Sequence, residues 1–317
     1  GVKPTKRITT RRGFVQEGAH EHRVLTVNND GAQVWKRQDE LAGGDWLVMQ
    51  KGQNLWGQDV AIDWRSTRRF GSQPIRIPER MTPDLARWLG YLVAEGDTRP
   101  DGTIRFANVE SELREDYCRL TLDLFGLQPR TYDHSVSVHL NSVALLDLIN
   151  YLGFHTGAYN KDIPWSVLRS SRECVLEFLA GYFAGDGSVN LQGRLFWSTA
   201  STTLATQLQI VLLNLGVVSR RTQTVQRAGE FVGTYWTVSV AGVDADLLAT
   251  QMRLLPLRKP LLQRQQPAQF PGAARVGLLL FAPLPLPEGP YGALHYSVLQ
   301  PESLAPAVPL RPLDAHK

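Results

Sequence analysis

The fold is decided by Leu89-Gly90-Tyr91-Leu92-Val93-Ala94-Glu95-Gly96 and by Leu179-Ala180-Gly181-Tyr182-Phe183-Ala184-Gly185-Asp186-Gly187. Each is an apolar run with helical spacing, and each contains small residues that let two helices approach closely. Each run ends in an acid followed by glycine. Because the C-terminal end of a helix carries partial negative charge, Glu95 and Asp186 lie where the helix dipole disfavours them. A divalent cation held between them would relieve this repulsion, and Mg²⁺ suits a few carboxylates and phosphate oxygens.

The same order of elements is predicted after each run. After Glu95 we expect a strand at 103–107, a helix at 111–125, strands at 130–132 and 135–140, and a helix at 143–152. After Asp186 we expect a strand at 193–198, a helix at 203–215, strands at 217–225 and 234–240, and a helix at 243–252. The sequence therefore predicts an α+β domain, residues 81–262, built from tandem αββαββα repeats at 81–165 and 171–262.

The paired motifs and the duplicated pattern resemble the LAGLIDADG homing endonucleases in their two-motif, single-chain form. The resemblance implies that the two motif helices pack at a pseudo-two-fold axis and that two sheets form a saddle over the DNA major groove. It implies that Glu95 and Asp186 bind Mg²⁺ over the scissile phosphates. It also implies a lysine near each acid, and Lys161 and Lys259 stand at the corresponding places. Such a lysine could activate water or stabilise charge that develops on the phosphate.

We therefore expect a site-specific, Mg²⁺-dependent endonuclease that acts on double-stranded DNA as a monomer. Arginine and glutamine side chains suit base edges in the major groove, and basic side chains also hold phosphates. Predicted strands or their ends carry Arg105, Arg130, Arg194, Arg220, Arg221 and Gln223. The formal net charge is only +4 and the pI about 9.1, so binding depends on these groups gathering on one face.

Two other functions stay open. A protein of the same fold could bind nucleic acid without cleaving it, as a maturase or a transcription regulator, although the presence of both acids favours cleavage. The chain could also belong to a protein-splicing element. The sequence as given does not begin with Cys or Ser and carries no convincing terminal His-Asn pair, so splicing has no reactants here.

Residues 1–60 differ from the repeat, with short strand and turn patterns such as Ala19-His20-Glu21-His22-Arg23-Val24-Leu25. They resemble part of the splicing (Hint) domain of inteins, in which His22 corresponds to the histidine that polarises the scissile peptide. Ala19 stands where that family usually has threonine. We therefore predict a small, mostly-β, partial or relic splicing domain in which His22 is a structural residue.

The remaining segments are a predicted linker and a predicted tail. Residues 61–80 form a basic linker that could lie along phosphates, with Arg65, Arg68, Arg69, Arg76 and Arg80. Residues 263–317 are rich in proline and show little periodicity, so they are predicted to be irregular.

The composition fits a protein of the cytoplasm. The two cysteines, Cys118 and Cys174, lack the spacing of a metal site and fit buried thiols of a reducing compartment. We find no secretory signal and no apolar run long enough to span a bilayer, so no membrane partner is expected.

Overall fold

The computed structural model describes residues 2–58, 60–65, 74–131, 135–228, 231–252 and 295–299. They fall into two units. The first contains the chain up to Gln53, the short segment Arg220–Thr222 and the strand His295–Leu299. The second contains Asn54–Ser219 and the chain from Gln223. No helix among the described residues is long and apolar enough to cross a membrane.

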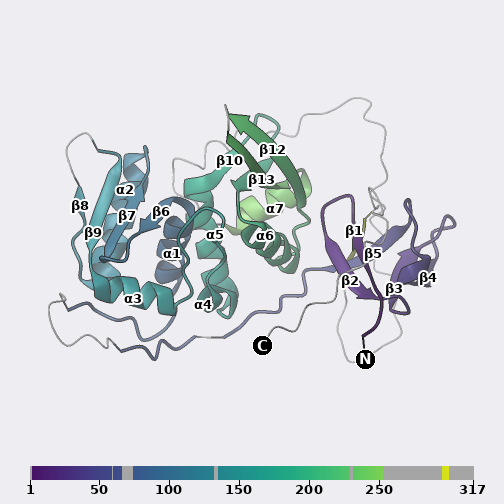
Figure 1. The fold of residues 1–317 in the computed structure, drawn as a ribbon, viewed down its shortest axis with the longest axis horizontal. Helices are drawn as coiled ribbons and strands as arrows, with labels where there is room; N and C mark the ends of the chain where they lie inside the picture. Colours follow the sequence, from purple (N-terminus) through teal and green to yellow (C-terminus); the bar gives the residue numbers. More distant parts are fainter. Residues whose placement is uncertain are drawn as a thin grey trace. The chain divides into compact units, whose positions relative to one another are not determined.

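The first unit consists of short antiparallel strands (Figure 1). β1 (Thr5–Thr9) pairs with β2 (Val15–Ala19). A four-stranded sheet has the order β14-β5-β3-β4, with β3 (Arg23–Val27), β4 (Gln33–Arg37), β5 (Trp46–Lys51) and β14 (His295–Leu299). A short 3₁₀ turn, η1 (Gln38–Glu40), follows β4. A small core of Ile8, Val24, Leu41 and Leu47 holds this unit together.

Strand β14 corrects the prediction that residues 263–317 are irregular. It pairs antiparallel with β5, and His295 lies opposite Lys51 in the ladder. The backbone of this strand pairs with β5, which lies far away in the sequence. A local pattern of turns and alternating residues therefore could not predict it. The rest of the predicted tail lies outside the described residues, as does Lys259.

The described parts of the predicted linker 61–80 pack on the second unit. The Ile62 N–H donates to the Glu79 carbonyl at 2.9 Å, and the Met81 N–H donates to the Val60 carbonyl at 2.8 Å. Ile62 is buried in the main core, and the apolar side chains packed against that core include Trp56, Val60, Trp64, Ile75 and Ile77. The described parts of this basic segment therefore also cover the core of the second unit, because apolar residues alternate with the arginines. Arg65, Arg76 and Arg80 are exposed, and Arg68 and Arg69 lie outside the described residues.

The second unit shows the same order of elements twice. The first set is α1 (Pro83–Glu95), β6 (Gly96–Thr98), β7 (Thr103–Ala107), α2 (Ser111–Phe125), β8 (Arg130–Thr131), β9 (Ser137–Asn141) and α3 (Val143–Tyr151). After the short α4 (Trp165–Leu168), the second set is α5 (Arg172–Asp186), β10 (Gly187–Val189), β11 (Leu195–Thr199), α6 (Thr202–Asn214), β12 (Arg220–Ala228), β13 (Phe231–Val240) and α7 (Val243–Gln251). The sheets have the orders β6-β7-β9-β8 and β10-β11-β13-β12.

The correspondence extends to single hydrogen bonds in the two hairpin turns. The Gly102 N–H donates to the Arg99 carbonyl at 3.0 Å, and the Gly193 N–H donates to the Asn190 carbonyl at the same distance. Gly102 and Gly193 have φ of 91° and 77°, in the left-handed region that glycine adopts without strain. The same turn therefore joins the first two strands of each sheet.

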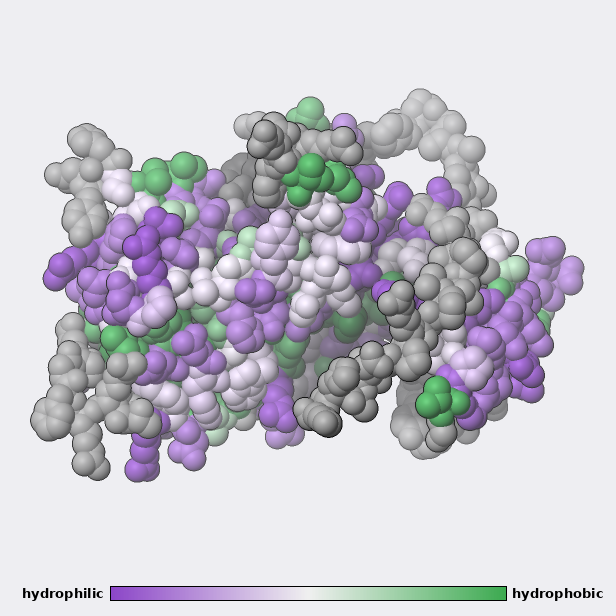
Figure 2. Space-filling model, in the orientation of Figure 1, coloured by the Kyte–Doolittle hydropathy of each residue, from purple (hydrophilic) through white to green (hydrophobic). Residues whose placement is uncertain are grey.

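Helices α1 and α5 occupy the centre of the second unit, side by side between the two sheets (Figure 1). α1 begins as its sequence predicts: the Thr82 hydroxyl accepts a hydrogen bond from the Leu85 N–H, and Pro83 occupies the first turn. Every residue from 85 to 94 and from 174 to 184 is buried, so both helices are enclosed on all sides. In the view of Figure 2, hydrophilic side chains cover most of the described surface, and hydrophobic ones form small separate patches.

Candidate metal and nucleic-acid site

Glycines let α1 and α5 approach until their backbones touch. A Cβ atom on Gly90 would lie 2.4 Å from the Phe178 carbonyl oxygen, and one on Gly181 would lie 2.3 Å from the Arg87 carbonyl oxygen. Near the C-terminal ends, a Cβ on Gly185 would lie 2.5 Å from the Ala94 Cβ. The two helices therefore run in the same direction, with their C-terminal ends adjacent.

These adjacent ends carry the two predicted acids. Glu95 is the last residue of α1 and Asp186 is the last residue of α5. Each is followed by an extended glycine whose N–H donates back into the helix, Gly96 to Leu92 and Gly187 to Phe183. A side chain on either glycine would collide with that same carbonyl, so each chain turns sharply from helix into strand directly after its acid. The structure thus brings Glu95 and Asp186 together, each with intermediate exposure.

The electrostatics of this pair favour a bound cation. Burial raises the pKa of Asp186 to about 7, and the charge of Glu95 contributes to the rise. Burial also raises the pKa of Glu95. The charge of Lys161 opposes both shifts and does not cancel them. It is costly to ionise two acids side by side, and a bound divalent cation would stabilise the ionised form of both carboxylates.

Lys161 lies at this pair, as its motif position predicts. Its ammonium donates to the Ala94 carbonyl, beside Glu95. The backbone carbonyl of Lys161 accepts a hydrogen bond at 2.5 Å from the Ser201 hydroxyl, at the start of α6. The segment that carries Lys161 is therefore anchored to both halves of the second unit, which places one ammonium group near both acids.

The raised pKa of Asp186 predicts a pH-dependent stability. Its pKa is 3.8 in the reference state and about 7 in the folded protein, so folding binds a proton between these values. Without a cation, the free energy of unfolding should therefore fall by roughly 2–4 kcal/mol as the pH rises from about 4 to about 7. Urea unfolding followed by circular dichroism in EDTA at several pH values measures this fall.

Other acids also titrate in this range, so the comparison is made against Asp186→Asn. This variant should lose the part of the pH dependence that Asp186 contributes and should be the more stable protein at pH 8. Identical pH dependence in the two proteins would contradict the assigned electrostatics.

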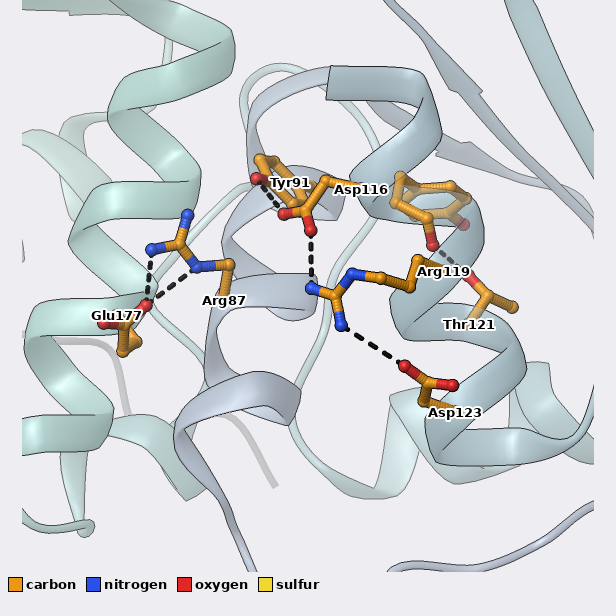
Figure 3. A network of polar contacts seen from close by, with 8 residues as sticks. Arg87, Tyr91, Asp116, Arg119, Thr121, Asp123 and Glu177 are labelled. Atoms are coloured by element: carbon orange, nitrogen blue, oxygen red, sulfur yellow. Dashed lines mark hydrogen bonds and ion pairs between the residues drawn. The ribbon is translucent and has the colours of Figure 1, made fainter. Parts of the chain in front are cut away.

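A buried ion pair crosses the helix interface near its other end (Figure 3). The Arg87 guanidinium of α1 donates to the Glu177 carboxylate of α5, from Nε at 2.7 Å and from Nη2 at 2.6 Å. Both side chains are more than nine-tenths buried. A pair of this kind favours one arrangement of the two helices, because removing either partner leaves a buried charge.

The predicted DNA-contacting residues of the first sheet form a row. In the ladder, Arg105 of β7 and Arg130 of β8 both lie opposite His139 of β9. Directly opposite residues share a face of the sheet, so three basic side chains lie side by side. Sequence reasoning missed His139, although it occupies an outward position in the alternating pattern Ser137-Val138-His139-Leu140.

The second sheet carries fewer of the predicted contacts at its exposed face. Arg194 is exposed just before β11, and Arg220 and Gln223 are exposed on β12. Arg221 is buried, and its guanidinium donates to the Gly13 carbonyl at 2.9 Å. The prediction that Arg221 contacts DNA is therefore corrected, because the side chain is used inside the protein.

The predicted splicing residue His22 is exposed in the turn between β2 and β3. Its backbone closes this turn: the His22 N–H donates to the Ala19 carbonyl at 2.9 Å, and its carbonyl accepts from the Gln38 N–H at 2.7 Å. These contacts are structural. As the sequence predicts for buried thiols, Cys174 is buried, whereas Cys118 is only partly buried, and neither cysteine forms a disulfide.

The chain is similar in sequence to parts of several longer proteins. The chain is 29% identical over 272 residues to the replicative DNA helicase DnaB of Rhodothermus marinus, which is 78% of this chain and 26% of that protein. It is 29% identical over 228 residues to the replication factor C small subunit of Methanocaldococcus jannaschii, 70% of this chain and 11% of that protein. It is 35% identical over 156 residues to a DNA polymerase of Thermococcus kodakarensis, 44% of this chain and 9% of that protein. The chain thus spans about a quarter of the helicase and about a tenth of the other two.

Two solved structures and one family model also match the chain. The full-length DUF199/WhiA protein from Thermatoga maritima matches with a TM-score of 0.40 and 10% identity, over 62% of this chain and 61% of that one. The N-terminal LAGLIDADG domain of DUF199/WhiA matches with a TM-score of 0.37 and 11% identity, over 56% of this chain and 86% of that one. The family model covers the segment from the start of α5 to the end of α7: residues 173–251 match the model of the LAGLIDADG-like domain.

Proposed function

We propose that the second unit is a double-strand DNA endonuclease in which Glu95 and Asp186 hold Mg²⁺ against a scissile phosphate. The observation that carries this proposal is the meeting of the two acids at the adjacent ends of α1 and α5, with the pKa of both raised. Two buried acids side by side destabilise the protein when no cation is bound. A bound cation and phosphate would offset this cost, which supports a functional role for the pair.

The residues present fit Mg²⁺. Among the described residues, no group of three or more His, Cys, Asp or Glu side chains is arranged to hold a metal, so the candidate ligands are the two carboxylates of Glu95 and Asp186. Two carboxylates suit Mg²⁺, which completes its coordination with water and phosphate oxygens. When bound, the cation would polarise the phosphate and lower the pKa of an attacking water. Lys161 is placed to stabilise negative charge that develops at the phosphate.

Duplex DNA is the proposed partner, and the basic row Arg105, His139 and Arg130 supports it. This row belongs to the sheet whose first strand, β6, begins directly after Glu95, so a phosphate backbone bound to the row could extend toward the acids. The two halves differ in their outward residues. We therefore infer that a single chain reads an asymmetric target across a saddle of two sheets related by a pseudo-two-fold axis.

A second candidate function is nucleic-acid binding without cleavage. It is favoured by the pKa of Asp186 near 7, because an acid that is partly protonated at neutral pH can serve as an uncharged structural residue. The basic row would then act alone. Cleavage assays at several Mg²⁺ concentrations separate the two functions.

We also infer that the chain derives from an intein. The relatives bear the names of a helicase, a replication factor and a DNA polymerase, and the chain covers only a small part of each. An element inserted into different host proteins would give this pattern. The first unit would then be the relic of the splicing domain, with His22 in a structural role.

The test is cleavage of a randomised duplex library with Mg²⁺, followed by sequencing of the ends. We expect cuts at related sites with Mg²⁺ and none in EDTA. If the immobilised protein retains intact duplexes and cuts none at any Mg²⁺ concentration, the endonuclease proposal is wrong and nucleic-acid binding without cleavage is the function.

A further inference from the structure

The hydroxyl group of Tyr182 is buried beside the proposed metal site. Tyr182 is fully buried and lies one helical turn before Asp186 in α5. Among the residues that the structure describes, none meets full hydrogen-bond geometry with this hydroxyl, and the Asp186 carboxylate and the Thr199 hydroxyl are the two groups that interact with it. A buried hydroxyl without a partner destabilises a protein, so its retention calls for an explanation.

Two polar side chains lie within reach of this hydroxyl. Burial raises the pKa of Tyr182 well above its usual value, the charge of Asp186 and a hydrogen-bonding interaction with its carboxylate raise it further, and an interaction with the Thr199 hydroxyl opposes the rise. Residues four apart lie on the same face of a helix, so Tyr182 and Asp186 share one face of α5. The Tyr182 O–H is thus a donor that interacts with the Asp186 carboxylate.

The first half of the unit uses its matching tyrosine differently. Tyr91 follows Gly90 as Tyr182 follows Gly181, and it lies one turn before Glu95. The Tyr91 hydroxyl donates to the Asp116 carboxylate of α2 at 2.7 Å (Figure 3). It is therefore committed to a structural bond and is not a donor to the site.

The second half has no such acceptor at the matching position of α6. Gln207 stands there, and its side-chain oxygen accepts a hydrogen bond at 2.7 Å from the Ile163 N–H. Because this oxygen already accepts a hydrogen bond from Ile163, the carboxylate of Asp186 remains as the acceptor for the Tyr182 hydroxyl. The two tyrosines therefore differ in their hydrogen bonds because α2 carries Asp116 where α6 carries Gln207.

We propose that Tyr182 is a positioning residue for Asp186. Its O–H donates to one carboxylate oxygen when Asp186 is ionised, and this contact directs the other oxygen toward the cation. The inference rests on the proposed function, because it requires that Glu95 and Asp186 bind Mg²⁺. It makes the two metal-binding acids unequal: Asp186 is oriented by a tyrosine of its own helix, whereas Glu95 has no such donor in Tyr91.

The experiment compares Tyr182→Phe with the matched control Tyr91→Phe in the full chain. Isothermal titration calorimetry with MgCl₂ alone, without DNA, measures cation affinity. We expect Tyr182→Phe to weaken Mg²⁺ binding about tenfold, the effect of losing one hydrogen bond to a charged group, and Tyr91→Phe to change it less than about twofold. Thermal unfolding in EDTA should move the other way: Tyr91→Phe melts lower because Asp116 loses its donor, and Tyr182→Phe melts no lower than the parent protein.

Each outcome decides. Opposite effects of the two variants on affinity and on melting support the positioning role, since a merely structural tyrosine would lower both. If the parent protein binds Mg²⁺, Asp186→Asn does not, and Tyr182→Phe binds like the parent, the metal site stands and the inference about Tyr182 is wrong. If the parent protein binds no Mg²⁺, the inference and the proposed function both fail.

Discussion

Replacement of Asp186 by asparagine is expected to slow cleavage of a target duplex by about a thousandfold or more, without loss of DNA binding. The amide keeps the shape of the side chain and removes the negative charge that would hold Mg²⁺. The fold should not suffer, because burial makes the charged form of Asp186 unfavourable in the first place. Single-turnover cleavage in Mg²⁺ and a gel-shift assay in Ca²⁺ measure the two properties separately.

The control for this prediction is Asp97→Asn. Asp97 follows α1 closely, but its carboxylate pairs with the Arg105 guanidinium at 3.3 Å and is exposed. This change should leave the cleavage rate within a few-fold of that of the parent protein. Cleavage by Asp186→Asn at the parent rate would show that the site is elsewhere. Loss of binding together with cleavage would show that Asp186 holds the fold or the DNA.

Gly181→Ala is expected to destabilise the second unit by about 3 kcal/mol or more, through the collision of one methyl group with backbone. The new Cβ would lie 2.3 Å from the Arg87 carbonyl oxygen, and backbone cannot move aside without separating α1 from α5. In a helix without such a neighbour, the same change would stabilise by about 1 kcal/mol. The sign of the effect therefore tests the close packing, and urea unfolding measures it.

A matched control is Thr203→Ala on the exposed side of α6. This substitution also introduces alanine into a helix of the second unit, and it should change the free energy of unfolding by less than about 0.5 kcal/mol. A neutral or stabilising Gly181→Ala would mean that the helices lie farther apart than the structure shows. The meeting of the two acids would then lose its geometric basis.

The sequence predicts the centre of this protein well, because the signals there are local. Helical spacing marks α1 and α5, Thr82 and Pro83 mark the start of α1, and the acids mark both ends. The order of the strands and helices follows from the same periodicities. Lys161 could be placed near the acids only through the family resemblance, since the contact with Ala94 spans a long stretch of chain.

What the sequence does not predict depends on contacts between distant segments. Strand β14 needs β5, and the segment around Ile62 needs the core of the second unit. Arg221 looks like any outward arginine of a strand until its bond to Gly13 is known. His139 becomes part of a basic row only through the register of β7, β9 and β8, and register is not visible in a single strand.

The ion pair between Arg87 and Glu177 determines which helices can pack against each other. In α1 the position of Glu177 is held by Ala86, and in α5 the position of Arg87 is held by Phe178. If α1 met the α1 of another molecule, each Arg87 would be buried without an acid. If α5 met another α5, each Glu177 would be buried without a base. Either exchange would cost about 3–5 kcal/mol for each stranded charge. Each of the two helices is thus the electrostatic complement of the other, and neither can pair with a copy of itself without burying an unpaired charge.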